Sequence, residues 1–564
     1  MHPLLADDTG KKMLLLGNEA IVRGALEAGC AVAAAYPGTP SSEIGNNLFF
    51  ISQEENAPIY FEFSTNEKVA MEVAAAAAAS GVRSLTCMKH VGMNVASDVL
   101  MTLAYVGVKG GMVIITADDP SMHSSQNEQD NRCFAKFANL PMLEPSSPQQ
   151  AKDMTIAAFG FSEALGLPVI LRTTTRISHV RGPVELGPMP TDVKRKGKFE
   201  KDPKRWVPVP AVARLRHKVL LDQVEKARSL SEDSGFNILT NKGADLVIVA
   251  SGVSICYVED ALMELDCASD VAFLRLGFPY PFPEKTIASF LKDAKKVLVV
   301  EELEPFLEDE INILCKRHGL DVSVLGKSSG HFPRMYEFEP LMVKRAIADV
   351  AGIEFERAAQ PDLSGLPTLP MRPPVLCKGC PHRETYNAVK TALKELGLEK
   401  KAIYPTDIGC YTLGLLPPIQ MADYLLCMGS SVGTSAGFSV STSHKIISFI
   451  GDSTFFHSGI SSLASAYHNQ HDFCLVILDN STTAMTGHQP NPGIEIRPPG
   501  YDKPRIPIEN VVRGLGIDDI HKINPYKKKD AIEIFKEVLA REGLSVVIAE
   551  APCILYYKKF GGKR

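Results

Sequence analysis

The chain has 564 residues, a formal net charge of −5 and 22% charged residues, which is ordinary for a globular protein. Its length predicts three or four domains at about 150 residues each. The slight negative charge argues against general nucleic-acid binding. No apolar stretch reaches the roughly 20 residues that a membrane span needs, and the N-terminus has no basic region followed by an apolar core. We therefore expect a cytoplasmic protein without a membrane span.

Residues 1–184 alternate between short apolar runs and helical stretches, which predicts an α/β domain with a parallel sheet covered by helices. A helix is expected at 66–80, and the strand at 167–172 is expected to be the last of this unit in the sequence. The expected strands are 13–17, 30–36, 83–88, 111–117 and 167–172.

Residues 185–239 are basic and proline-bearing, and we interpret them as a solvated linker or excursion rather than a nucleic-acid-binding segment. Residues 240–355 form another α/β unit, with strands expected at 245–252, 272–276 and 297–301. Gly252 follows a strand, but no G-x-G-x-x-G pattern follows, so the dinucleotide-binding signal is weak. Residues 356–375 are proline-rich and predict a stiff linker. Residues 376–564 form the last α/β unit.

The last unit carries the most informative pattern. An apolar run at 445–450 ends in a Gly-Asp-Ser turn that contains Asp452, and a second run at 473–478 leads to Asn480. Both runs predict buried parallel strands, whose carboxyl ends form the ligand-binding edge of an open sheet. A carboxylate, an amide oxygen and a nearby carbonyl suit Mg²⁺ that holds a diphosphate. An ordinary strand–turn–helix with an aspartate N-cap is the alternative.

Twelve cysteines are spread along the chain, and Cys377 and Cys380 form the one close pair. A cytosolic chain keeps such thiols reduced. Tetrahedral zinc needs a second pair at a matching spacing, which the sequence lacks, so a zinc knuckle is the less favoured interpretation. A ferredoxin-type run of closely spaced cysteines is also missing from the sequence.

Ten short stretches, in order along nearly the whole chain, match one family. They are 18–21, 35–44, 66–70, 88–92, 107–111, 117–130, 377–382, 407–411, 428–431 and 483–490. Together they resemble the large (α) subunit of indolepyruvate:ferredoxin oxidoreductase, within the 2-oxoacid:ferredoxin oxidoreductases. The resemblance implies a multidomain thiamine-diphosphate-binding fold. Its domains would be a pyrimidine-binding domain (1–184), a transketolase C-terminal-like domain (240–355) and a diphosphate- and Mg²⁺-binding domain (376–564).

The resemblance also implies catalytic residues. Glu67 matches the glutamate that hydrogen-bonds the aminopyrimidine of thiamine diphosphate and helps to activate it. Glu72 on the same helix is its nearest competitor, and a glutamate that only favours the helix N-terminus is the alternative. Lys89 and His90 follow a strand and suit an anionic 2-oxoacid and its proton transfers, with a surface turn as the alternative.

The remaining expected contacts with the cofactor and the metal follow from the same matches. Thr39 is also a candidate for the substrate carboxylate or for a helix N-cap. For Cys410, a plain buried thiol is the alternative. The expected metal ligands are Asp452, Asn480 and the carbonyl of Thr482. The expected cofactor-binding residues are Glu67, Pro37, Thr39, His382, Cys410, Gly429, Ser430, Ser431, Gly451, Asp452, Ser453, Asn480, Met485 and Thr486.

The implied reaction is oxidative decarboxylation of an aryl or related 2-oxoacid to an acyl-CoA, with thiamine diphosphate and Mg²⁺ as cofactors. The family's α subunits usually carry a tail with two iron–sulfur clusters, whereas Cys553 is the one cysteine near the end of this sequence. We therefore expect no iron–sulfur cluster on this chain. Electrons would leave through an external carrier or a partner redox subunit.

A smaller β subunit and a homo- or hetero-oligomer are also expected. The runner-up function keeps the cofactor and drops the oxidation, giving a lyase, a carboligase or an acyl transferase that uses CoA substrates. A non-catalytic binding or regulatory subunit is the third interpretation.

Overall fold

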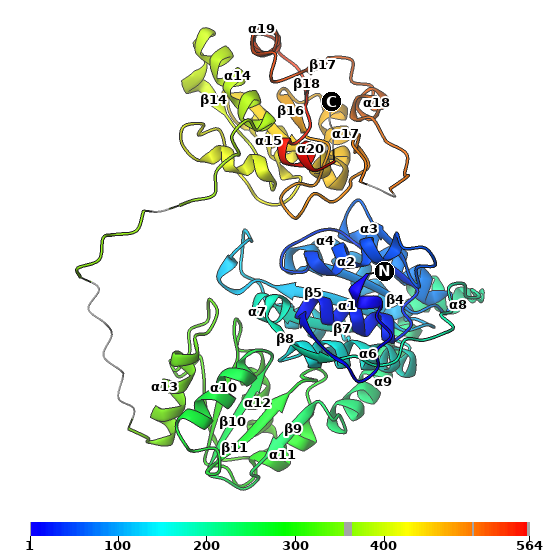
Figure 1. Ribbon diagram of the computed structural model, residues 1–564, viewed down its shortest axis with the longest axis vertical. Coiled ribbons are helices and arrows are strands. Elements are labelled where there is room, and N and C mark those ends of the chain that lie inside the picture. Colours follow the sequence, from blue (N-terminus) through cyan, green and yellow to red (C-terminus); the bar gives the residue numbers. More distant parts are fainter. Residues whose placement is uncertain (1, 355–363, 371, 499–500, 561–564) are drawn as a thin grey trace. The chain divides into compact units, whose positions relative to one another are not determined.

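The computed structural model describes residues 2–354, 364–370, 372–498 and 501–560. The chain divides into two compact units, Met1–Gln360 and Pro361–Arg564, each with its own sheets and helices (Figure 1). Of the predicted proline-rich linker at 356–375, residues 356–363 and 371 lie outside the described residues. Within the described residues, every helix is too short or too polar to span a lipid bilayer.

The first sheet of unit 1 has six parallel strands in the order β3-β2-β4-β5-β7-β6. Strands β4, β5 and β7 are buried along their whole length, which explains their unbroken apolar runs. The predicted parallel sheet is confirmed. The strands are β2 (Val32–Ala35), β3 (Tyr60–Phe63), β4 (Ser84–Lys89), β5 (Met112–Asp118), β6 (Met142–Leu143) and β7 (Val169–Thr174).

The predicted place of the first strand is wrong. The first predicted strand, β1 (Lys12–Leu16), pairs antiparallel with β8 (Arg181–Glu185) in a separate two-stranded ribbon. Strand β1 is only partly buried, and Leu14 is exposed. It therefore does not fit the parallel sheet, whose strands are covered by helices on both faces. The last predicted strand of the unit, β7, is the last strand of this sheet in the sequence, and it lies inside the sheet because the two-residue strand β6 forms the edge.

Helices cover the first sheet. Alanine-rich α3 (Glu67–Ala79) packs closely on β2 and β4, because its small side chains let the backbones approach. It begins as predicted, where the Asn66 side chain accepts a hydrogen bond from the Val69 amide at 2.9 Å. The other helices of this part are α1 (Gly17–Glu27), α2 (Ser42–Ser52), α4 (His90–Val106), α5 (Arg132–Ala138), α6 (Pro148–Leu165) and α7 (Thr175–His179).

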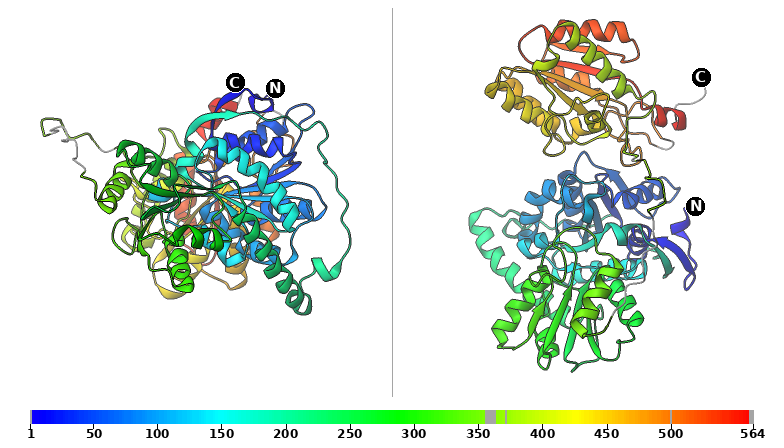
Figure 2. Two further views of the ribbon diagram at one scale, coloured as in Figure 1. Left: turned by 90° about the horizontal axis from the view of Figure 1, so that it is seen from below. Right: turned by 90° about the vertical axis from the view of Figure 1, so that its left-hand side faces the viewer.

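The second sheet of unit 1 has the order β13-β12-β10-β11-β9, with β9 antiparallel at one edge. Helices α10 (Ser254–Glu264) and α13 (Pro340–Ala351) pack on one face, and α11 (Glu284–Leu291) and α12 (Phe306–His318) pack on the other (Figure 2). The strands are β9 (Asn237–Thr240), β10 (Leu246–Ser251), β11 (Val271–Leu276), β12 (Lys296–Val300) and β13 (Ser323–Leu325).

The expectation that residues 185–239 are a linker is wrong for much of that segment. It contains α8 (Pro203–Trp206) and α9 (Pro210–Glu232), and α9 packs against α4. Buried side chains at helical spacing, Leu220, Val224 and Ala227, belong to the core of unit 1. The helix was missed because most of its surface is charged and exposed.

Unit 2 is built on one parallel sheet with the order β14-β15-β16-β18-β17. Helices α14 (Pro381–Glu395) and α19 (Lys528–Leu539) cover one face, and α15 (Ser430–Ser441), α17 (Ile460–His468) and α18 (Ile508–Gly514) cover the other. A last helix, α20 (Ile554–Phe560), follows the sheet. The strands are β14 (Ala402–Ile403), β15 (Lys445–Gly451), β16 (Cys474–Asp479), β17 (Ile520–Ile523) and β18 (Ser545–Glu550).

A buried ion network joins the two sheets of unit 1. The Arg132 side chain, at the start of α5, donates to both carboxylate oxygens of Asp130 and, at 2.7 Å, to Glu301 after β12. It also donates to the carbonyls of Glu302 and Glu304, at 2.9 and 3.0 Å. One guanidinium therefore binds loops that follow strands of both sheets.

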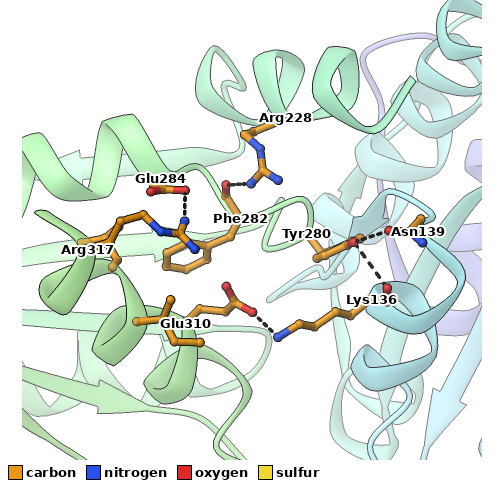
Figure 3. A pocket seen from close by; sticks show the side chains of 10 residues that line it. Lys136, Asn139, Arg228, Tyr280, Phe282, Glu284, Glu310 and Arg317 are labelled. Carbon is orange, nitrogen blue, oxygen red and sulfur yellow. Dashed lines mark hydrogen bonds and ion pairs between the residues drawn. The ribbon is translucent and has the colours of Figure 1, made fainter. Parts of the chain in front are cut away.

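A polar cavity of about 310 Å³ lies in the same unit, between α5, α9, α11 and α12 (Figure 3). Two ion pairs cross it, Lys136 with Glu310 and Arg317 with Glu284, and Arg228 donates to the Phe282 carbonyl at 2.9 Å. Because its charges already pair with one another, we assign this cavity no ligand.

Candidate functional site

The carboxyl ends of β15 and β16 bring the three predicted metal ligands together. Asp452 follows β15 directly and opens the short helix α16 (Asp452–Thr454), while Asn480 and Thr482 follow β16. The backbone N–H of Thr482 donates both to Asp452 Oδ2, at 3.1 Å, and to Asn480 Oδ1, at 3.2 Å. All three residues are buried. Two side chains that share one donor must lie close to each other, so the three residues meet at a single point.

The electrostatics of this point favour a bound cation. Burial, with the nearby Asp479 carboxylate, raises the pKa of Asp452 to about 8. Burial also raises the pKa of Asp479 to about 6. Two neighbouring buried carboxylates are unfavourable when both are ionised, and a divalent cation relieves that cost. A carboxylate, an amide oxygen and a carbonyl form the oxygen donor set that Mg²⁺ prefers, so the residues present fit this metal.

His382 contacts one of the predicted metal ligands, Asn480. It is buried in the first turn of α14, and its Nε2 accepts a hydrogen bond from Asn480 Nδ2 at 3.0 Å. Burial lowers the pKa of His382 to about 4, so the imidazole is neutral near pH 7. The sequence could not reveal this contact, because 98 residues separate its two partners.

The start of α15 forms the predicted small-residue turn. Gly429 adopts a φ of +81°, and a Cβ there would lie 2.0 Å from Ser458 Oγ, so the turn requires glycine. Ser430 Oγ accepts from the Cys427 amide at 3.2 Å, and Ser431 Oγ donates to buried Asp407 at 2.6 Å. A helix start of this kind suits a diphosphate.

Asp407 and Tyr411 hold this turn in place, and the sequence interpretation gave neither a role. The Tyr411 hydroxyl donates to Asp407 and, at 3.2 Å, to Thr454 Oγ1 next to the Gly-Asp-Ser turn. Burial raises the pKa of Asp407 to about 7, although bonds from Ser431 and Tyr411 oppose that rise. A Cβ on Gly451 would lie 2.6 Å from the Tyr411 ring. The matched stretch 407–411 was the one sequence signal for them.

The loop after Thr482 contains the other predicted residues. Thr483 Oγ1 donates to Ser453 Oγ at 2.9 Å, which ties this loop to the Gly-Asp-Ser turn. The Thr486 hydroxyl instead donates to Gln489 Oε1 at 2.7 Å, within the loop. Met485 is half exposed in unit 2. Roles for Met485 and Thr486 at the cofactor stay predictions.

Four cysteines that are scattered in the sequence come near one another. Burial raises the pKa of the Cys410 thiol to about 12, and the charges of Cys380, Cys553 and Cys377 add to this effect. Among the described residues, no group of three or more His, Cys, Asp or Glu side chains is placed to hold one metal ion, so zinc at Cys377 and Cys380 gains no support. The expectation that the chain holds no iron–sulfur cluster came from sequence spacing alone, and it stays a prediction.

In unit 1, Glu67 is buried at the first position of α3. A Cβ on Gly92, in the first turn of α4, would lie 2.6 Å from Glu67 Oε1, so the carboxylate packs directly on the α4 backbone. Glu72 is instead half exposed and pairs with Lys68. The structure therefore favours Glu67 over Glu72 as the residue of a buried site.

Lys89 and Thr39 lie together at the carboxyl edge of the first sheet. Lys89 ends β4 and is buried, and its ammonium donates to the Ser124 carbonyl at 2.5 Å. Burial lowers the pKa of Lys89 to about 8, with Asp119 opposing that fall. The Ser124 hydroxyl donates to the Thr39 carbonyl at 3.3 Å. A Cβ on Gly38 would lie 2.9 Å from Lys89 Cβ, so the turn that holds Pro37 and Thr39 packs on this lysine.

His90 opens α4 and is fully buried. Its Nε2 lies 3.2 Å from both the carbonyl and the side-chain oxygen of Asn127, and its Nδ1 is buried without a hydrogen-bond partner. Asp119 was not predicted, yet it organises the neighbouring loop by accepting from the Ser124 amide at 2.9 Å and the Thr175 hydroxyl at 2.8 Å. The edge of unit 1 thus gathers Thr39, Lys89 and their supporting loop.

Comparisons with known proteins agree with both halves of this description. A family model described as "Pyruvate flavodoxin/ferredoxin oxidoreductase, thiamine diP-bdg" matches residues 23–226. Another, described as "Thiamine pyrophosphate enzyme, C-terminal TPP binding domain", matches residues 407–549.

Curated relatives match over nearly the whole chain. The indolepyruvate oxidoreductase subunit IorA of Methanothermobacter thermautotrophicus is 52% identical over 98% of this chain and 89% of its own length. Its counterpart from Pyrococcus abyssi is 46% identical over 98% of this chain and 87% of its own length. That from Archaeoglobus fulgidus is 44% identical over 99% and 89%. The chain therefore belongs to the family of indolepyruvate oxidoreductase IorA subunits, which are thiamine-diphosphate-dependent 2-oxoacid oxidoreductases.

Proposed function

We propose that this chain is the thiamine-diphosphate-binding subunit of an enzyme that oxidatively decarboxylates an aryl 2-oxoacid, such as indolepyruvate, to an acyl-CoA. One observation carries the proposal. Asp452 and Asn480 both accept a hydrogen bond from the backbone amide of Thr482, so the three residues lie together. They supply the oxygen ligands that Mg²⁺ needs to hold a diphosphate. When bound, thiamine diphosphate supplies the electron sink for loss of CO₂.

The residues of unit 2 bind and orient. Asp452, Asn480 and the Thr482 carbonyl hold Mg²⁺, and the amides at the start of α15 hold the diphosphate, with Ser453 beside them. Asp407 keeps this helix start in place by accepting from Ser431 Oγ at 2.6 Å. His382, Cys410, Met485 and Thr486 remain proposed cofactor contacts.

The residues of unit 1 act on protons and on the substrate. Buried Glu67, which packs against the first turn of α4, hydrogen-bonds the aminopyrimidine and holds a proton there. The Lys89 ammonium binds the carboxylate of the 2-oxoacid, together with Thr39, and His90 moves a proton. Pro37 fixes the backbone of the turn that carries Thr39.

The reaction requires partners. Oxidation of a 2-oxoacid releases two electrons, which we propose leave through a partner redox subunit or an external carrier. A small β subunit and CoA complete the assembly, and the cytoplasm is its proposed location. Analysis of the purified chain for iron and acid-labile sulfide decides whether electrons leave the site through this chain. A stoichiometric amount of both would overturn the expectation of a cluster-free subunit.

The experiment is a CO₂-release assay on the chain purified with its native partners. Indolepyruvate is supplied with and without CoA and with and without a dye as electron acceptor. We expect release that depends on thiamine diphosphate, Mg²⁺ and the acceptor. Equal release without any acceptor would favour the non-redox lyase. No calorimetric binding of thiamine diphosphate with Mg²⁺ would contradict the proposal and favour a non-catalytic subunit.

A further inference from the structure

We propose that His382 and Asn491 are positioning residues of the metal site, which select the oxygen atoms that Asn480 and Asp452 present to the cation. The inference rests on the proposed function, because it assumes that these two residues bind Mg²⁺. It gives His382 a role at the metal site in addition to the proposed contact with the cofactor, and it adds Asn491, a residue outside every pattern recognised in the sequence.

The first part concerns the orientation of the Asn480 amide. A carboxamide presents either an oxygen or an NH₂ group in a given direction, and only the oxygen binds a cation. The Nδ2 group of Asn480 donates to Nε2 of His382 at 3.0 Å. Its Oδ1 then accepts from the Thr482 amide at 3.2 Å, on the side where Asp452 lies. Loss of the His382 acceptor removes one of the two bonds that fix this orientation, and it leaves only the 3.2 Å bond from the Thr482 amide, which Asp452 shares.

His382 is itself held firmly, which a positioning residue requires. It is 3% exposed and stands edge-on to the Tyr411 ring, with the ring centroids 6.1 Å apart. Tyr411 is fixed in turn by its hydroxyl bond to Asp407 and by the Tyr386 hydroxyl, which donates to its carbonyl at 2.9 Å. To accept from Asn480, the imidazole must carry its proton on Nδ1.

The second part concerns the Asp452 carboxylate. Its Oδ2 accepts two hydrogen bonds, from the Thr482 amide at 3.1 Å and from Asn491 Nδ2 at 2.9 Å. Two donors occupy that oxygen, which leaves Oδ1 as the better ligand for the cation. Asn491 is 5% exposed, and its own Oδ1 accepts from the Gly493 amide at 2.8 Å, which fixes its amide so that the NH₂ group faces Asp452.

Outer residues of this kind tune the affinity of a metal site without touching the metal, and their loss typically costs roughly tenfold to 100-fold in affinity. A purely structural role for His382 would instead lower thermal stability in the absence of metal and leave the affinity of the folded fraction unchanged. A positioning role therefore changes the metal affinity, whereas a purely structural role changes the thermal stability without metal.

The test titrates Mn²⁺ into the full chain with thiamine diphosphate present and measures free Mn²⁺ by electron paramagnetic resonance. His382→Leu removes the acceptor, and His382→Gln restores one through its side-chain carbonyl. Asn491→Ala removes the second donor to Asp452 independently. His471→Gln is the matched control, because His471 pairs with Ser439 at 2.9 Å, apart from the metal ligands. Melting without metal is recorded for every variant.

We expect His382→Leu and Asn491→Ala each to weaken Mn²⁺ binding by roughly tenfold to 100-fold. His382→Gln should remain within about threefold of the unmodified chain, and His471→Gln should match it. The inference is overturned if His382→Leu and Asn491→Ala bind Mn²⁺ normally, or if His382→Gln is as weak as His382→Leu. An unmodified chain that binds no Mn²⁺ with thiamine diphosphate would reject the proposed function itself.

Discussion

At the scale of single residues, Glu67 and Glu72 show what the sequence can and cannot decide. A helix was expected at 66–80, and α3 begins at Glu67, directly after its N-cap Asn66. The burial of Glu67 was not predictable, because it depends on Gly92 of another helix. In the same way, His382 and Asn480 stood out as separate candidates in the sequence, but their contact exists only in the fold.

Glu67→Gln tests the proton-holding role. The amide keeps the shape of the side chain but cannot share a proton with the aminopyrimidine, so turnover should fall by roughly 100-fold to 10,000-fold. Calorimetry should show Mg²⁺-dependent cofactor binding within a few-fold of normal. Glu72→Gln is the control and should retain normal turnover, since Glu72 is half exposed. A Glu67→Gln variant with near-normal rates would disprove the assignment.

Lys89 predicts a pH dependence of substrate binding. Burial lowers the pKa of this ammonium to about 8, so it is charged below that pH and neutral above it. The charged form attracts the substrate carboxylate, so KM for the 2-oxoacid should rise by about tenfold per pH unit above pH 8. KM measured from about pH 6.5 to 9.5 checks this. Lys89→Arg should flatten the rise, because arginine stays charged throughout, and a flat profile in the unmodified enzyme would exclude the role.

At the scale of helices and strands, the sequence was most informative where strands are buried on both faces. Runs such as β5 and β16 are continuously apolar, and the sequence placed them correctly. It failed for α9, whose buried side chains are few and whose other positions are charged and exposed. It also failed for the pairing of β1, because pairing with β8 depends on a strand far along the chain.

Gly92→Ala tests how closely α3 and α4 must approach. The new Cβ would lie 2.6 Å from Glu67 Oε1 and would push the carboxylate from its position. A displacement of this size should lower kcat by about 100-fold. Gly160→Ala in α6 is the control, since nothing lies within 4 Å of its Cβ. That control should keep full activity and gain about 0.5–1 kcal/mol of stability in urea unfolding. Normal kcat in Gly92→Ala would show that Glu67 tolerates displacement.

At the scale of the whole molecule, the sequence predicted α/β units on parallel sheets but not what joins them. Arg132 and Glu301 are 169 residues apart, and nothing local marks them as partners. Both are at most 1% exposed, so the network is hidden from solvent. Arg132 also contacts Asp130, whose pKa is lowered because Arg132 and Arg172 outweigh the effect of burial. The domain boundaries at 184, 239, 355 and 375 remain predictions.

Arg132→Met tests this network. It leaves the carboxylates of Asp130 and Glu301 buried without their main partner, so the free energy of unfolding should fall by about 3–5 kcal/mol. Arg334→Met is the control, because the Arg334–Glu304 pair is exposed and should contribute at most about 1 kcal/mol. Urea unfolding followed by circular dichroism measures both. Equal losses in the two variants would contradict a special role for the buried pair.

The guanidinium of Arg132 also bears on how the protein responds to heat. Its donors are committed to loops from two different sheets, so neither sheet can loosen while the other stays intact without exposing unpaired charge. The two sheets of unit 1 should therefore unfold together, as one peak in a calorimetric trace. An enzyme of this kind would lose both sheets in a single transition instead of in two successive ones.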